Sequence, residues 1–147
     1  MDSEHCELYC EGIALHHKKI KAKVEKIRYQ QAVEITRTYE YKDGVANAVA
    51  DKNTDIEKIE IYIDGVKATI NYPEYWLKTF KLALKRFKER YGEEASTTIQ
   101  NRYGKGMIVT ETYVKQGISK SLFDRRRLNF LKIFVYYALK FRLLDID

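Results

Sequence analysis

Proline and glycine are scarce in this sequence. Proline occurs once and glycine seven times in 147 residues, and no Gly/Ser/Pro-rich stretch divides the chain. Because linkers between domains are rich in these residues, the sequence predicts one domain over residues 1–147. We expect it to be β-rich over residues 19–72 and helical over residues 73–144. A chain of this length buries a sizeable core.

Long hydrophobic runs are also missing. The longest, Ile133–Leu139, is far shorter than the ~20 apolar residues that span a bilayer. The acidic N-terminal sequence MDSEHCELYCEG lacks the basic start and apolar run of a secretory signal. These absences predict a cytoplasmic protein with no membrane partner.

Catalytic motifs are the third absence. The sequence has neither a G-x-S-x-G nor an HExxH motif. Histidine is confined to His5, His16 and His17, so general acid–base chemistry would depend on carboxylates and lysines. We therefore expect a protein that is not an enzyme.

Both cysteines and all three histidines lie close to the N-terminus. Thiolate and imidazole are ligands that zinc prefers, and four of them can close a tetrahedral site. The spacing C-x3-C-x5-H-H does not match the usual zinc-finger patterns, and two alternatives stay open. Cys6 and Cys10 can be small buried apolar residues one helical turn apart, or they can form a disulfide. The candidate zinc ligands are Cys6, Cys10, His16 and His17.

Positive charge is abundant and is segregated along the chain. The net charge is +6, but residues 102–142 carry ten Lys/Arg against two Asp/Glu. Residues 39–66 have the opposite balance, with three basic and seven acidic residues. Segregation of this kind favours a surface that faces a polyanion. The abundance of Lys, Glu, Ile and Tyr with little Gln is common in proteins of thermophiles.

The N-terminal half shows short alternating patterns. Residues 18–28 fit either an edge strand or a frayed helix, and residues 32–41 alternate with the period of a strand. Residues 42–44 are then a turn, 45–50 a returning strand and 51–54 a loop. The clearest element is a hairpin over 57–71, with Asp64-Gly65 as its two-residue turn. The predicted fold class is α+β: a small N-terminal antiparallel sheet, with three to five strands, packed with two or three C-terminal helices.

Pro73 opens a predicted helix that ends at Gly92. Apolar residues recur along it at the helical period and form a single stripe. The opposite face carries a row of lysines, which is either a solvated face or a flank that contacts phosphates. These lysines are Lys78, Lys81, Lys85 and Lys88.

The last third of the chain combines a basic segment with the most apolar one. Gly117 is suited to end a helix, and Ser119 is suited to begin the next, which can run for about 25 residues. Apolar residues cover most of this C-terminal helix, more than one packing layer needs, and they predict a homodimer that uses it as its interface. They are Phe130, Leu131, Phe134, Val135, Ala138 and Phe141.

Residues 109–128 resemble the helix-turn-helix DNA-binding superfamily. The resemblance rests on Gly117 in the turn, Ile118 after it, residues 119–121 opening a helix, and Phe123 at an inward position. It implies that the second helix lies in the major groove of DNA. The sequence departs from the family at Tyr113, where a small residue normally lets the two helices approach, and in the length of the second helix.

The sequence thus predicts a small DNA-binding regulator. Residues expected to face the bases are Lys120, Arg125, Arg126, Arg127 and Asn129, and residues expected to contact phosphates are Lys78, Lys81, Lys85, Lys88, Arg102 and Lys105. Arg126 and Arg127 also fall near the apolar side of the helix, where pairing with Glu111 or Asp124 is the alternative. Two other functions stay open: an assembly or virion-type interaction module, and single-strand binding by Tyr39, Tyr41 and Tyr62.

Overall fold

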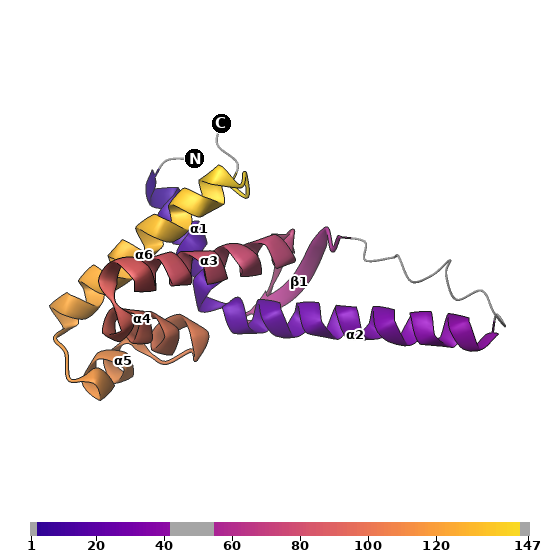
Figure 1. Ribbon diagram of the computed structural model, residues 1–147, viewed down its shortest axis with the longest axis horizontal. Helices are drawn as coiled ribbons and strands as arrows, with labels where there is room; N and C mark the ends of the chain where they lie inside the picture. The colour runs from indigo at the N-terminus through magenta and orange to yellow at the C-terminus, as the bar shows by residue number, and fades with distance from the viewer. Residues whose placement is uncertain (1–2, 42–54, 145–147) are drawn as a thin grey trace. The chain divides into compact units, whose positions relative to one another are not determined.

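The computed structural model describes residues 3–41 and 55–144, and only the backbone of residues 35–41. Within these residues the chain forms six α-helices, one π-helical segment and one hairpin (Figure 1). In order they are α1 (Ser3–Leu15), α2 (His17–Tyr41), β1 (Lys58–Ile63), β2 (Val66–Asn71), α3 (Pro73–Tyr91), α4 (Glu93–Ile99), η1 (Gln100–Gly104), α5 (Val109–Gln116) and α6 (Lys120–Lys140). No helix within the described ranges has both the length and the apolar character needed to cross a membrane.

The chain divides into two compact units. The helical unit comprises Met1–Lys18 and Tyr75–Asp147, and the hairpin unit comprises Lys19–Glu74. The hairpin of the second unit confirms the prediction for residues 57–71: β1 and β2 pair antiparallel, with Ile63 opposite Val66. Asp64 and Gly65 have φ values of 50° and 80°, the positive φ that a tight two-residue turn between twisted strands requires.

The predicted α+β class is confirmed, but the N-terminal position predicted for the sheet is wrong. Only two strands are present in the described part of the chain, they lie in its middle, and four α-helices follow them. The predicted strand over 32–41 is the C-terminal part of α2, and the ambiguous segment 18–28 is its beginning. The predicted turn, strand and loop over 42–54 fall outside the described residues.

The helical period explains why α2 forms. Ile20 and Val24 are buried, and Ile27 and Gln31 are half-buried, at i, i+4, i+7 and i+11 of one helix face. The segment has no proline or glycine, and its many Lys, Glu, Gln, Arg and Ala residues favour a helix. Within the hairpin unit, the Lys19 ammonium donates to the carbonyl of Tyr62 at 3.0 Å.

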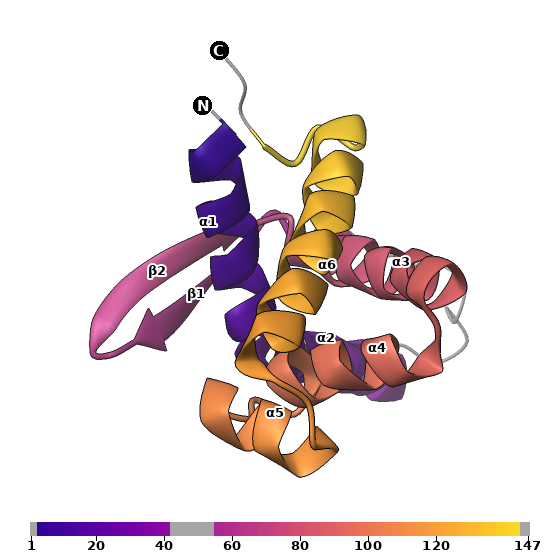
Figure 2. The same ribbon diagram turned by 90° about the vertical axis from the view of Figure 1, so that its left-hand side faces the viewer.

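An aromatic core holds the helical unit together. Ring pairs join α3 to α6, including Trp76 with Phe134 at 5.8 Å and Phe80 with Phe130 at 5.5 Å between centroids. Helix α1 lies alongside α6, while α5 lies next to the beginning of α6 (Figure 2). The apolar stripe predicted on the helix from Pro73 faces this core, and its aromatic residues Trp76, Phe80 and Phe87 are buried.

Candidate nucleic-acid interface

The turn between α5 and α6 has the local geometry that its residues predict. Gly117 has φ 66° and ψ 30°, a left-handed conformation that glycine adopts without strain. The amide of Ile118 donates to the carbonyl of Tyr113 at 3.1 Å, which closes the end of α5. Ser119 then caps α6, because its hydroxyl accepts from the amide of Leu122 at 3.1 Å.

An aromatic pair occupies the inside of this turn. The ring of Tyr113 lies 6.3 Å from that of Phe123, which is buried. Thr112 is fully buried and donates its hydroxyl to the carbonyl of Ile108. The bulky Tyr113, which departs from the helix-turn-helix pattern, therefore serves as packing between α5 and α6.

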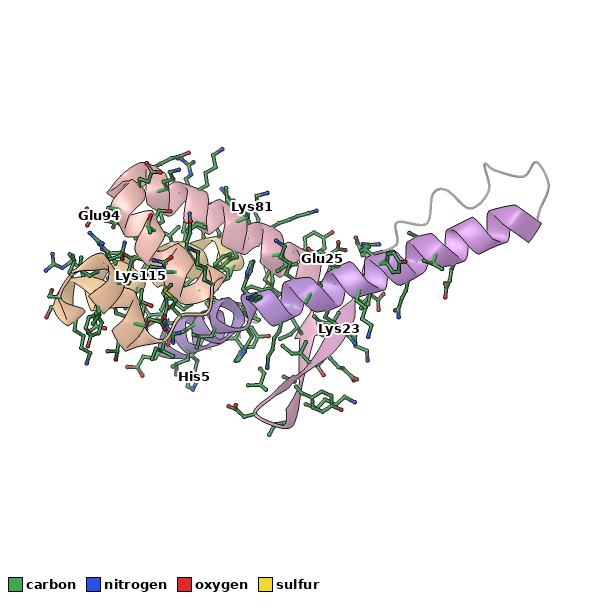
Figure 3. All side chains as sticks on the ribbon, turned by 90° about the horizontal axis from the view of Figure 1, so that it is seen from below. His5, Lys23, Glu25, Lys81, Glu94 and Lys115 are labelled. Carbon is green, nitrogen blue, oxygen red and sulfur yellow. The ribbon has the colours of Figure 1, made fainter. Side chains whose placement is uncertain are left out.

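The three consecutive arginines have different surroundings. Arg125 is exposed. Arg126 donates to the hydroxyl of Thr98 at 2.9 Å and lies 3.6 Å from the carboxylate of Glu94, which Figure 3 labels on α4. Arg127 forms an ion pair and hydrogen bond with Glu11 of α1. The intramolecular pairing considered from the sequence is therefore present, but with Glu94 and Glu11 as the acids.

A polar cluster surrounds the Arg127–Glu11 pair. The buried Tyr103 of η1 donates its hydroxyl to Glu11 at 3.0 Å, so one carboxylate joins α1, η1 and α6. Burial, together with the charge of Glu11 and the hydrogen bond to it, raises the pKa of Tyr103 well above its usual value. Arg127 is thus held by Glu11. Its guanidinium group could contact bases only if this ion pair broke.

The outward face of α6 continues from Arg125 to Tyr136. Arg125, Asn129, Lys132 and Tyr136 are spaced by four, three and four residues, which places them on one side of the helix. Beyond Arg125 this face borders a groove of about 740 Å³ between α3 and α6. The groove is lined by Arg86, Glu89, Arg90 and Tyr91 of α3 and by Asn129, Lys132, Ile133, Tyr136 and Tyr137 of α6.

Arg86 is held in place at the edge of this groove. Its Nε donates to the hydroxyl of Tyr137 at 2.9 Å, and its Nη1 lies 3.3 Å from Glu89. One turn further along α3, the Arg90 guanidinium lies over the ring of Tyr91 at 5.5 Å. The sequence-based prediction missed Arg86 and Arg90, since the lysine row was the more regular signal. Their proximity to Lys132 depends on how α3 packs against α6.

The predicted phosphate-contacting residues are dispersed. Lys78, Lys81, Lys85 and Lys88 are all exposed, and Lys81 extends from the outer side of α3 (Figure 3). Adjacent helix residues point about 100° apart, so the row that includes Lys85 lies beside the groove that Arg86 lines, and not within it. Arg102 donates to the carbonyl of Met107 at 2.8 Å, which ties η1 to the segment before α5. Lys105 and Lys120 are exposed.

The four candidate zinc ligands are not gathered into a site. Cys6 and Cys10 are free thiols buried in α1, and the ring of His17 stacks on Phe80 at 4.2 Å. Across residues 3–41 and 55–144, no three His, Cys, Asp or Glu side chains are arranged to hold a metal ion. Cys6 and Cys10 are buried one helical turn apart, as one of the alternatives to a zinc site expected. The arrangement of the four candidate ligands does not support the predicted zinc site.

Comparison of the chain with protein-family models, with curated proteins and with solved structures finds no match.

Proposed function

We propose that this protein binds nucleic acid, with duplex DNA as its ligand, through the outward face of α6. The observation that carries the proposal is the concentration of exposed cationic groups along this face and its groove. Arg125 and Lys132 lie on α6, and Arg86 and Arg90 lie across the groove on α3, while Glu89 is the one carboxylate among the groove residues. Such a surface attracts phosphates and releases their counterions.

The contacts fall into two classes. Arg125 and Asn129 carry planar donor groups that can hydrogen-bond base edges, and Lys120 lies at the start of the same helix. Lysines give less directional contacts that suit phosphate oxygens, so Lys132 and the row on α3 supply affinity without discrimination between sequences. The α5–α6 pair is proposed to act as a helix-turn-helix, with α6 as the reading helix.

A titration of the full chain against random duplex DNA at low salt tests the proposal. We expect a complex at micromolar protein and a log K that falls with log salt by about 0.9 for each phosphate contact. Replacing Lys81 and Lys85 by alanine then flattens the slope by up to about 2 and weakens all sequences alike. Arg125→Ala costs roughly 1–3 kcal/mol on a preferred site and little on random DNA.

A control variant that loses the same number of charges elsewhere distinguishes binding by this surface from an effect of the overall positive charge. The double variant Lys21→Ala/Lys26→Ala removes two exposed lysines of α2 and is expected to leave the salt slope unchanged. The absence of any complex at micromolar protein and low salt would show the proposal to be wrong. An equal flattening by the control variant would show that the row on α3 has no special part in binding.

Part of the apolar surface that motivates the alternative of an interaction module is buried within the chain. Of the six residues expected to form the interface, Phe130, Leu131, Phe134 and Ala138 are buried in the core of the helical unit. Val135 is half-buried and Phe141 is 45% exposed, so these two residues carry what is left of this alternative.

A further inference from the structure

The groove between α3 and α6 has more chemical variety than phosphate binding requires. Its lining includes the cations Arg86, Arg90 and Lys132 and the amide of Asn129. Tyrosine rings from both helices also line it. The groove is open to solvent, and its volume of about 740 Å³ is within the range of clefts that bind small organic molecules, ~300–1,000 Å³.

Three cationic side chains line the same groove. Arg86 donates its Nε to Tyr137 and contacts Glu89 through Nη1, so part of its side-chain freedom is already lost before an anion binds. Arg90 follows one turn later, and Lys132 is on the facing helix. Guanidinium groups form paired hydrogen bonds with phosphate oxygens, which fixes orientation as well as charge.

The aromatic residues provide a surface on which a base can stack. Tyr136 is 59% exposed, although its ring meets the edge of Tyr137 at 5.1 Å and an angle of 77°. Tyr137 in turn stacks on Phe141 at 6.0 Å, so a series of rings supports Tyr136 from within the chain. A supported but exposed aromatic ring is the platform on which proteins stack the bases of single strands.

We propose that this groove binds one unpaired nucleotide of a nucleic acid. Its phosphate lies against Arg86, Arg90 and Lys132, its base stacks on Tyr136, and Asn129 hydrogen-bonds the base edge. The nucleotide is unpaired because a base inside a duplex is already covered on both faces by its neighbours. The inference rests on the proposed nucleic-acid binding and adds the structural class of the preferred ligand: a duplex with a bulge, a gap or a frayed end.

Three DNA probes of equal length test the inference by fluorescence anisotropy with the full chain. One is fully paired, the second has a single bulged thymidine, and the third has an abasic residue at the bulge. We expect the thymidine bulge to bind about tenfold or more tightly than the paired duplex, which is the size of a base–aromatic stack. The abasic bulge is expected to lose most of this advantage, because it keeps the bend and the phosphate but lacks the base.

Substitutions then assign the preference to the groove. Tyr136→Leu is expected to abolish the preference for the thymidine bulge, while Tyr136→Phe keeps the ring and the preference. Tyr62→Leu, at an equally exposed tyrosine of β1, is the matched control and keeps the preference. Equal binding of the paired and bulged probes overturns the inference and leaves nucleic-acid binding intact. A preference that survives Tyr136→Leu, or one that Tyr62→Leu removes, also overturns it, and no binding to any probe at low salt overturns both proposals.

Discussion

Three adjacent arginines on α6 have separate physical roles. Arg125 is exposed, whereas the side chain of Arg127 is 32% exposed and paired with a carboxylate that also accepts from Tyr103. Replacing Arg127 by glutamine is expected to lower the free energy of unfolding by about 1–2 kcal/mol. This is less than the cost of breaking a fully buried pair, because water partly screens the charges.

The matched variant is Arg125→Gln, which removes the same charge two residues earlier. It is expected to change the free energy of unfolding by no more than about 0.5 kcal/mol. Urea unfolding of both variants measures the difference. Equal stabilities would contradict a structural role for Arg127.

The raised pKa of Tyr103 makes a prediction about alkaline stability. The folded state holds the phenol proton above pH ~10, where the unfolded chain loses it. The protonated phenol of Tyr103 therefore makes its full contribution to the free energy of unfolding below pH ~10. This contribution is lost as the pH rises from there through the folded-state pKa. Tyr103→Phe is expected to lower the free energy of unfolding by about 1 kcal/mol at neutral pH, because the hydrogen bond to Glu11 is lost. Its free energy of unfolding is expected to fall less steeply at high pH than that of the wild type.

Unfolding measured across alkaline pH checks this expectation. Tyr136→Phe, at an exposed tyrosine of the same helical unit, is the control and should decline as the wild type does. A decline in Tyr103→Phe as steep as that of the wild type would refute the assignment to this hydroxyl.

Burial also governs the chemistry of the two thiols. Desolvation, with a smaller contribution from the neighbouring Cys6, raises the pKa of the Cys10 thiol to about 12. Because the thiolate is the reactive form, native protein at pH ~8 is expected to react with a thiol reagent far more slowly than unfolded protein. A matched control is Leu8→Cys, at an exposed position of α1, which adds one rapidly reacting thiol. Rapid labelling of two thiols in the native wild type would contradict the packing of α1.

At the scale of elements, the left-handed conformation of Gly117 makes the α5–α6 turn sensitive to a single methyl group. A Cβ at this position meets no atom within 4 Å, so Gly117→Ala loses stability only through the strain of a positive φ. We expect a loss of about 1 kcal/mol in the free energy of unfolding. Gly12→Ala, also free of nearby atoms but inside α1, is expected to gain roughly 0.5–1 kcal/mol. Thermal unfolding of both variants tests the contrast in sign.

Elements that depend on a few neighbouring residues could be predicted from the sequence. The hairpin was predictable because Asp64-Gly65 and the alternation around it agree, and Gly117 and Ser119 defined the boundary between α5 and α6. The C-terminal part of α2 was predicted as a strand because Val33 and Ile35 alternate with polar residues. The buried i, i+4 pair that indicates a helix, Ile20 and Val24, lies earlier in the segment. Helical propensity over the whole segment outweighed a short alternating run.

The candidate site was predictable only where it lies on one helix. Arg125 and Asn129 belong to the outward face of α6, which the sequence period identifies. Arg86 and Arg90 could not be assigned to it, since their position beside Lys132 is set by side-chain packing between helices distant in sequence. For the same reason the sequence could not show that Arg127 finds its carboxylate at Glu11, on the first helix of the chain.

At the scale of the whole molecule, the predicted homodimer remains a proposal. Burial of Phe130 and its neighbours leaves Leu128, Tyr136 and Phe141 as the large exposed hydrophobic side chains of α6 and its C-cap. If these residues and the two-fold symmetry of a palindromic site drive association, light scattering at micromolar concentration gives twice the 17.4 kDa of one chain. A mass of 17.4 kDa would exclude a dimer under these conditions.

Trp76 gives the helical unit a built-in optical reporter. It is the one tryptophan in the sequence, and its buried ring lies 5.7 Å from that of Tyr9 in α1 and 5.8 Å from that of Phe134 in α6. An indole shielded from water emits at shorter wavelength than a hydrated one. Its emission therefore shifts to the red when the junction of α1, α3 and α6 separates, and nearby tyrosines cease to transfer excitation to it. Loss of packing at this junction can thus be followed in unlabelled protein, at concentrations too low for calorimetry.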